Sequence, residues 1–232
     1  MPPRFSIIIP VLHEEAVITA TVDHLGEFLR NERFEGEIIV VDGDTEGKTI
    51  GAVTGSGSAI KTAVGIRGRG SQMNEGAALA EGDILLFLHA DTRLPPGAFS
   101  LVEAALRKPG CRAGAFDLAI DSERPVFRII ETVASFRSRL TRIPYGDQAH
   151  FFRRKYFREI GGYAKIPLME DVEIMRRIKK RKEKIVIVKK AVSTSARRWE
   201  KEGVLTCTLR NWLLIILYLC GLSPDYLSRF YK

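Results

Sequence analysis

The sequence of 232 residues has only three cysteines, and their scarcity excludes two kinds of scaffold. Cys111, Cys207 and Cys220 form an odd set in no metal-ligand spacing, so neither a disulfide framework nor a structural zinc site is expected. The expected location is therefore a reducing compartment, the cytoplasm. Hydrophobic residues make up 45% and charged residues 28% of the chain, which indicates a globular fold and argues against disorder.

The sequence also lacks an apolar run long enough to cross a bilayer. The run Trp212 to Leu219 is well short of the roughly 20 residues that a transmembrane helix needs. We expect a C-terminal apolar helix over 205–220. Three placements for it stay open: core packing, a homodimer interface, or peripheral attachment to the inner face of the cell membrane.

Acidic residues are outnumbered by Lys and Arg, 28 against 36, which leaves a net charge of +8. A basic chain favours an anionic partner, which can be a nucleotide diphosphate, nucleic acid or an anionic membrane. Much of the excess lies in 176–190, where apolar residues interrupt the charges, and this favours an exposed helix face followed by a buried strand. A non-enzymatic basic module that binds nucleic acid or anionic membrane stays open as an alternative function.

The first part of the chain alternates strands and helices. Phe5 to Val11 is a nearly continuous apolar run, as expected of a strand buried on both faces of a sheet. Apolar residues recur at helical spacing from Glu14 to Arg30, and its acidic start suits a helix amino terminus. Further strands are expected over 37–41 and 83–88. These units predict parallel crossovers, so ligands are expected at the carboxyl ends of the strands.

The remaining segments alternate less cleanly, which predicts a mixed sheet whose first half binds nucleotide and whose second half shapes an acceptor site. We expect a loop over 47–58, a weaker strand over 59–66, an Ala-rich helix ended by Gly82, a helix over 95–108, a strand over 114–120, a helix over 125–140, a strand over 148–153, a basic helix to about 182 and a strand over 185–188.

Two acidic residues directly follow expected strands. Asp91 follows the strand 83–88, a position that would hold a carboxylate rigidly for Mg²⁺ or Mn²⁺ and a diphosphate. Asp42 follows the second strand and could accept hydrogen bonds from a base or ribose. Each residue also has an explanation without function: Asp91 could cap the next helix, and Asp42 could simply form an Asp-Gly turn.

A second acidic site, Glu170-Asp171, precedes the basic helix. A carboxylate placed over the anomeric carbon of a sugar could take the proton from an acceptor hydroxyl. Acidic residues also favour helix amino termini for electrostatic reasons alone, so both interpretations stay open here.

The segment Arg67 to Gly70 alternates two arginines with two glycines, a combination that suits phosphate. It is no Walker A loop, because no Gly-Lys-Ser/Thr follows, and a dinucleotide fingerprint would lie directly after the first strand. Sugar nucleotidyl transfer, which uses related α/β folds, stays open as an alternative reaction, although the late position of this segment gives it little support.

Six motifs occur in one order along the chain: Ser6–Glu15, Val40–Gly43, Gly68–Asn74, His89–Thr92, Gly146–Gln148 and Met169–Val172. This ordered set resembles that of the inverting family 2 glycosyltransferases with a GT-A fold, and in particular a bacterial subgroup with HADT and MEDV motifs. The resemblance extends over nearly the whole chain. Each motif is weak by itself, whereas six in the same order are specific.

The resemblance implies roles for residues on the donor side. Six would contact the nucleotide sugar or its diphosphate: Pro10, Glu14, Asp42, Arg69, Asn74 and Asp91. Asp91 resembles the metal-binding acid of the family's Asp-x-Asp signature, but His89 stands in place of the first acid of that signature. A neutral imidazole can ligate a metal, so the implied metal ligands are Asp91 and His89. The imidazole brings less charge than a carboxylate would.

The resemblance also implies roles on the acceptor side. Asp171 resembles the general base, with Glu170 as an acceptor contact or as a partner of the base. The implied acceptor or phosphate contacts are Asp147, Gln148, Arg197, Arg198 and Trp199. A basic surface with one half-buried tryptophan explains the last three equally well.

Taken together, the resemblance implies an α/β, GT-A-type Rossmann-like fold with a mostly parallel central sheet flanked by helices. We expect one domain over 1–232, with a nucleotide-sugar-binding half (1–94) and a mixed acceptor half (95–232). The expected partners are a UDP- or GDP-linked sugar and Mn²⁺ or Mg²⁺, with no nucleic acid. The acceptor has no signature in the sequence, and a lipid-linked one would suit a peripheral membrane contact.

Overall fold

The computed structural model describes residues 4–53 and 59–231 of the chain, and its centre is one eight-stranded sheet in the order β3-β2-β1-β4-β7-β6-β8-β5. The strands are β1 (Phe5–Val11), β2 (Gly36–Asp42), β3 (Ala59–Val64), β4 (Ile84–Phe87), β5 (Thr92–Arg93), β6 (Cys111–Asp121), β7 (Phe151–Arg153) and β8 (Lys184–Ser195).

The first four positions in the sheet are parallel, since β1 pairs with both β2 and β4, and β2 pairs with β3. The other half is mixed. β7 is antiparallel to β4 and β6, β8 is parallel to β6, and the short β5 is antiparallel to β8. The predicted α/β fold, with a parallel first half and a mixed second half, is therefore confirmed.

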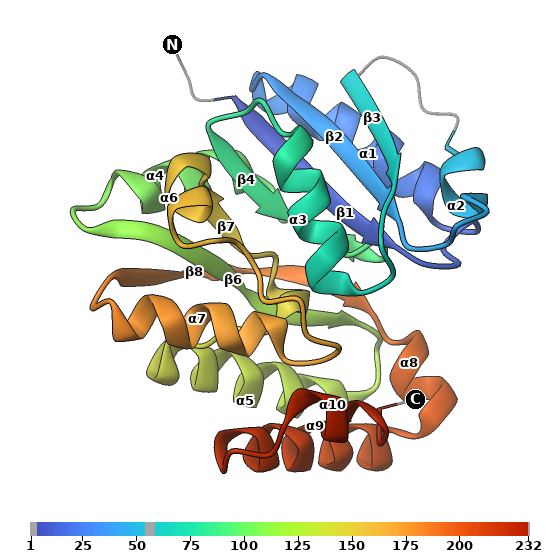
Figure 1. The fold of residues 1–232 in the computed structure, drawn as a ribbon, viewed down its shortest axis with the longest axis vertical. Coiled ribbons are helices and arrows are strands. Elements are labelled where there is room, and N and C mark those ends of the chain that lie inside the picture. The colour runs from blue at the N-terminus through green and yellow to red at the C-terminus, as the bar shows by residue number, and fades with distance from the viewer. Residues whose placement is uncertain (1–3, 54–58, 232) are drawn as a thin grey trace.

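Helices cover both faces of this sheet. They are α1 (Ile18–Glu32), α2 (Lys48–Gly51), α3 (Arg69–Leu79), α4 (Ala98–Arg107), α5 (Pro125–Thr141), α6 (Arg154–Glu159), α7 (Glu170–Lys180), α8 (Arg197–Glu202), α9 (Val204–Leu219) and α10 (Pro224–Ser228), with a 3-10 turn η1 (Gly146–Gln148). α1 and α4 form the core on one face, and α3, α6 and α7 form it on the other. In Figure 1, α5 and α9 lie at the end of the molecule furthest from β1–β3.

The structure corrects several expected boundaries. α1 begins at Ile18, not at Glu14, and its first turn contains no acidic residue. The chain turns first, with His13 at a φ of 57°, and the Glu14 side chain binds elsewhere. The predicted loop 47–58 contains α2, while its residues 54–58 lie outside the described residues.

The second half also differs in detail. β8 continues to Ser195, well past the predicted 185–188, because a bulge lets it stay paired with β6. The predicted strand 148–153 is shorter, since 146–148 form η1, and α6 follows it directly. Within residues 4–53 and 59–231, none of the helices combines the length and apolar character that membrane crossing requires.

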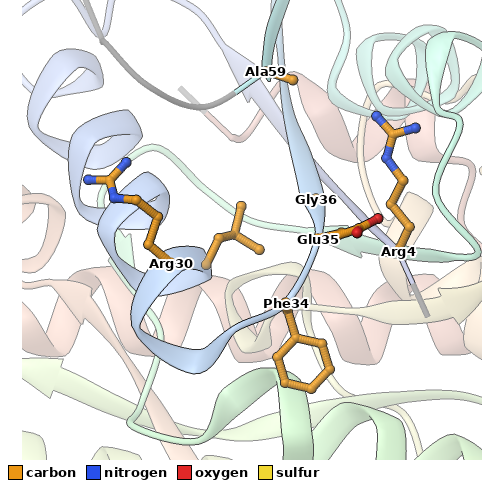
Figure 2. A pocket seen from close by; sticks show the side chains of 7 residues that line it. Arg4, Arg30, Phe34, Glu35, Gly36 and Ala59 are labelled. Carbon is orange, nitrogen blue, oxygen red and sulfur yellow. The ribbon is translucent and has the colours of Figure 1, made fainter. Parts of the chain in front are cut away.

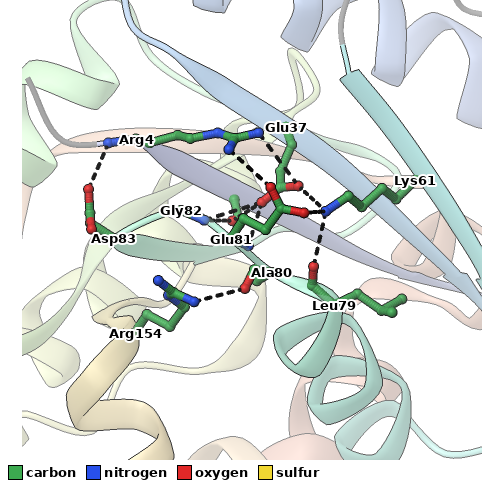
Figure 3. A network of polar contacts seen from close by, with 10 residues as sticks. Arg4, Glu37, Lys61, Leu79, Ala80, Glu81, Gly82, Asp83 and Arg154 are labelled. Atoms are coloured by element: carbon green, nitrogen blue, oxygen red, sulfur yellow. Dashed lines mark hydrogen bonds and ion pairs between the residues drawn. The ribbon is translucent and has the colours of Figure 1, made fainter.

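The amino-terminal ends of the parallel strands are tied together by charged side chains (Figure 3). Glu37 is fully buried and accepts hydrogen bonds from Ser6 and from the Glu81 amide, both at 2.7 Å, and its carboxylate lies 2.8 Å from the Lys61 ammonium. Burial alone would raise the pKa of Glu37, but these partners lower it to about 2. The network joins β1, β2 and β3 to the start of β4.

A surface hollow of about 330 Å³ lies at the same amino-terminal end (Figure 2). It is lined by the residue before β1, the end of α1, the turn that leads into β2, and the first residues of β2 and β3: Arg4, Leu29, Arg30, Phe34, Glu35, Gly36 and Ala59. Parallel α/β sheets bind ligands at the carboxyl ends of their strands. This hollow lies at the opposite ends of the strands and is therefore not the candidate site.

Candidate active site

Two predicted donor residues, Glu14 and Asp91, and Arg197, a predicted acceptor or phosphate contact, meet at the carboxyl ends of the strands. Arg197, directly after β8, lies between two carboxylates: its Nη2 is 2.5 Å from Oε1 of Glu14 and its Nε is 3.2 Å from Oδ2 of Asp91. The hydrogen bond that Arg197 donates to Glu14, and the charge of Asp91, raise the pKa of Arg197. The second oxygen of Glu14 is buried and has no partner among the described residues. This Glu14–Arg197–Asp91 cluster joins the ends of β1, β4 and β8.

Two other predicted donor residues lie beside this cluster with different surroundings. Asp42 is fully buried, and its carboxylate accepts hydrogen bonds from the amides of Asp44 and Thr49, each at 2.9 Å. It therefore shapes the loop that begins α2. Pro10 lies beyond the last residue of β1 that pairs with β4. Proline has no backbone N–H to donate, and at this position no hydrogen bond to β4 is lost.

Arg69 at the start of α3 reaches the acidic site. Its Nε donates to Oε1 of Glu170, a residue that is 1% exposed, and the charge of Glu170 raises the pKa of Arg69. α3 packs closely against the segment that precedes α7, because a Cβ added to Gly70 would lie 2.6 Å from the carbonyl oxygen of Ala164 and 3.4 Å from Cβ of Glu170. Only glycine fits this contact, which places the arginine beside the carboxylates.

Asp171 is held rigidly at the amino terminus of α7. Its Oδ2 accepts a hydrogen bond from the Gly146 amide at 2.7 Å, and its Oδ1 accepts one from the Val172 amide at 2.7 Å. Met169, just before the helix, adopts a left-handed conformation with a φ of 68°. Each carboxylate oxygen keeps a free lone pair after these bonds, so Asp171 is fixed in place yet able to accept a proton.

Asp147 of η1 is the neighbouring carboxyl group. Burial, and then the charge of Asp171, raise the pKa of Asp147 to about 6, although Arg137 and Arg69 oppose the shift. Its Oδ1 is buried without a hydrogen-bond partner in the described part of the chain. A carboxyl group with one buried oxygen that lacks a partner, beside a second carboxyl group, is costly to keep, and such sites commonly serve chemistry or binding.

His89 lies on the other side of the same turn. A Cβ added to Gly146 would lie 3.4 Å from Nε2 of His89 and 3.5 Å from Oδ2 of Asp171, so both side chains approach this glycine closely. Burial, and then the positive charge of Arg69, lower the pKa of His89 to about 3. The imidazole is therefore neutral at neutral pH and can act as a ligand or a hydrogen-bond acceptor.

The donor set fits a divalent metal only together with a ligand. Across residues 4–53 and 59–231, no group of three or more His, Cys, Asp or Glu side chains is arranged to hold a metal ion. Asp91 and His89 could supply at most two ligands. Mg²⁺-type sites often use one or two carboxylates and take their other ligands from substrate phosphates and water, and such a site is compatible with these residues.

Four other predicted residues are engaged within the protein. The Asn74 amide exchanges two hydrogen bonds with the backbone of Tyr163, at 2.8 and 2.9 Å. Gln148 is fully buried and bonds to Phe116 and Ser138. Both hold loops behind the site, and their ligand contacts stay predictions.

The other two, Arg198 and Trp199, lie on α8 and face the C-terminal segment and α5. Arg198 donates to the Tyr231 hydroxyl at 2.5 Å, and its guanidinium lies 4.2 Å from the centre of that ring. Trp199 packs edge-on against Phe127, with ring centroids 6.0 Å apart. Their roles as acceptor or phosphate contacts also stay predictions.

Sequence reasoning missed two residues at this site. The guanidinium of Arg137, on α5, lies 3.3 Å from the ring centre of Tyr145 and close enough to Asp147 to affect its pKa. Tyr231 contributes to the surroundings of both Arg69 and Arg198. Neither had a signal, since Arg137 is one of many charges on its helix and Tyr231 is the penultimate residue.

Three solved structures share this fold. The first is a mannosyltransferase from Pyrobaculum calidifontis in complex with GDP-Man and Mn²⁺, with a TM-score of 0.62 and 21% identity over 84% of this chain and 57% of that one. The second is mannosyl-3-phosphoglycerate synthase from Rubrobacter xylanophilus, with a TM-score of 0.58 and 21% identity over 87% of this chain and 75% of that one. The third is TarS from S. aureus, with a TM-score of 0.56 and 15% identity over 98% of this chain and 42% of that one.

Sequence comparison gives the family. No curated protein matches the chain significantly. The model of glycosyl transferase family 2 matches residues 6–164, which is more than half of the 232 residues and includes the ends of β1, β2 and β4. The chain therefore belongs to glycosyl transferase family 2.

Proposed function

We propose that the protein transfers a sugar from a nucleotide diphosphate sugar to an acceptor hydroxyl by a single displacement with inversion. The observation that carries the proposal is the position of Asp171, fixed by two backbone amides beside the positive charge of Arg69. Family membership supports the reaction class, and the Glu14–Arg197–Asp91 cluster supplies a place for the donor at the adjacent strand ends.

On the donor side, Arg197 and Arg69 bring fixed positive charge to the leaving diphosphate. Asp91, with His89, would hold Mn²⁺ or Mg²⁺, which when bound neutralises charge on the departing nucleotide diphosphate. The mannosyltransferase from Pyrobaculum calidifontis is in complex with GDP-Man and Mn²⁺. We propose a GDP- or UDP-linked donor for this chain as well.

On the acceptor side, Asp171 takes the proton of the attacking hydroxyl as the new glycosidic bond forms. Glu170 holds Arg69 and thereby sets the charge next to the base. The unpartnered oxygen of Asp147 accepts a hydrogen bond from the acceptor. With one base and no covalent intermediate, the anomeric configuration inverts.

The proposal is tested by thermal shift against a panel of GDP- and UDP-sugars with and without Mn²⁺, followed by NMR of the transferred sugar. A raised Tm with one donor, and an inverted product, are expected. A retained configuration would contradict the mechanism, and release of pyrophosphate from a nucleoside triphosphate would indicate nucleotidyl transfer in its place.

A further inference from the structure

One whole face of α9 is apolar and open to solvent. Its outward side chains recur at spacings of three and four residues, which places them on one side of the helix, and they are between 46% and 73% exposed: Leu205, Leu209, Trp212, Leu213, Ile216 and Leu219. Arg210 is the only charged residue of α9, and it pairs with Glu202 on the protein side. The outward face therefore carries no charge.

α5 presents a second apolar stripe of the same kind. Ile129, Val133, Phe136 and Leu140 are all exposed and occupy one side of this helix. The two helices are neighbours, because Val204 of α9 packs in one cluster with Phe127 and Ile130 of α5, and both lie at the same end of the molecule (Figure 1). An exposed apolar surface larger than the roughly 300–600 Å² of an ordinary monomer's largest patch commonly marks an interaction site.

The exposed charges of α5 and of the two residues that cap it have one sign, and the exposed acids Asp121 and Glu123 precede the helix. From residue 124 to residue 142, every exposed charged side chain is an arginine: Arg124, Arg128, Arg139 and Arg142. Arg128 and Arg139 also bond to Glu131 and Asp117 but stay 55% and 41% exposed. Glu131, the one acid of α5, turns inward and accepts a hydrogen bond from the Ile120 amide.

An apolar centre with a basic rim complements an anionic lipid surface, where apolar side chains enter the acyl boundary and arginines meet headgroups. A second copy of the chain is a poorer occupant. In a two-fold dimer the same patch meets itself, so the arginines of one copy would face those of the other.

We infer that the exposed faces of α5 and α9, here called the α5–α9 face, dock the protein on an anionic bilayer surface. The inner side of α9 supports a consequence for catalysis. Leu214 packs in one cluster with Met169 and Val172, the residues on either side of Glu170-Asp171. Asp171 thus lies next to residues packed on the inner side of α9, and the helix, about 10 Å in diameter, stands between them and its outward face. On the proposed function, the acceptor is then a hydroxyl of a lipid-linked molecule at the membrane surface.

The test is co-sedimentation of the full chain with vesicles of pure phosphatidylcholine and with vesicles in which roughly one third is phosphatidylglycerol. We expect binding to the anionic vesicles and little to the neutral ones. Leu213→Glu/Ile216→Glu should lower the partition coefficient at least tenfold. Val64→Glu/Ile66→Glu, an equally exposed apolar pair on and beside β3, should bind as the unmodified protein does.

A second pair of variants tests the basic rim. Arg124→Gln and Arg142→Gln should each weaken binding to anionic vesicles about fivefold and leave binding to neutral vesicles unchanged. Unchanged binding by the α9 variant would overturn the inference. So would sedimentation of the unmodified protein as a dimer that this variant dissociates, without vesicle binding, since the face would then join two copies.

Donor-induced thermal shifts without vesicles separate this inference from the proposed function. If the donor raises the Tm but the protein does not bind vesicles, the docking inference is overturned and the proposed function is not. Vesicle binding without a response to any nucleotide sugar would overturn the proposed function and leave the α5–α9 face supported.

Discussion

Replacement of Asp171 by asparagine tests the proposed base with almost no change in shape. The carboxylate accepts two backbone hydrogen bonds, from Gly146 and from Val172, one on each oxygen. Asparagine has one oxygen, so one of these amides loses its acceptor, and we expect a loss of about 1–3 kcal/mol in the free energy of unfolding. Loss of a general base should lower kcat by about 10²–10⁴-fold.

The assay measures transfer and donor binding separately. Product formation is followed by chromatography, and donor binding by calorimetry under the same conditions. Glu173→Gln is the matched control, since Glu173 belongs to the same first turn but pairs with Arg177. We expect it to keep its rate, while Asp171→Asn binds donor normally and transfers poorly. Undiminished transfer by the asparagine variant would refute the assignment of Asp171 as base.

Three further variants test the surrounding charges. Folding raises the pKa of the Asp147 carboxyl from 3.8 to about 6, so its ionisation at neutral pH destabilises the folded protein by up to about 3 kcal/mol. Asp147→Asn should remove this cost, and in denaturant titrations the gain should shrink as pH falls from 6 to 4. Glu37→Gln should cost about 3 kcal/mol at pH 7. Since the Glu37 pKa is lowered from 4.5 to about 2, the difference should vanish as pH falls through that range, and a constant difference would contradict it. Arg197→Ala should tighten Mn²⁺ binding without donor, because Asp91 loses its counter-charge, and weaken donor binding about tenfold or more; calorimetry measures both.

Much of the fold could be predicted from the sequence because its inner strands are buried on both faces. Continuous apolar runs of this kind, such as Phe5–Val11, have few alternatives to a central parallel strand. β8 was predicted too short for the opposite reason. Lys189 and Lys190 interrupt its apolar pattern, yet the bulge at this point lets both charges stay exposed while pairing resumes beyond them.

The helix start at Glu14 shows how a tertiary contact can defeat a local rule. An acidic pair before an apolar helical pattern normally favours the amino terminus of that helix. Here the Glu14 carboxylate binds Arg197 instead, a residue so distant along the chain that no spacing reveals the pair, and α1 begins only at Ile18.

The sequence predicted where several candidate residues lie at the strand ends, but not which side chains they contact. Strand ends placed Asp91 and Glu14 at one edge of the sheet. Their common partner Arg197 follows from the path of β8, which no motif encodes. Asn74 shows the converse, since its motif suggests the diphosphate while both of its amide atoms bond to the Tyr163 backbone.

Stability and function often compete in an enzyme, and here they depend on opposite ends of the sheet. At the amino-terminal end, Oε1 of Glu37 accepts hydrogen bonds and its Oε2 lies 2.8 Å from the Lys61 ammonium. At the carboxyl end, Asp147 and Glu14 each keep a buried oxygen that has neither a hydrogen bond nor an ion pair within the described part of the chain. Because the stabilising network and the costly carboxylates are separated by the length of the strands, substitutions that redesign substrate choice at one end need not weaken the other. The chain is for this reason a tolerant starting point for engineering.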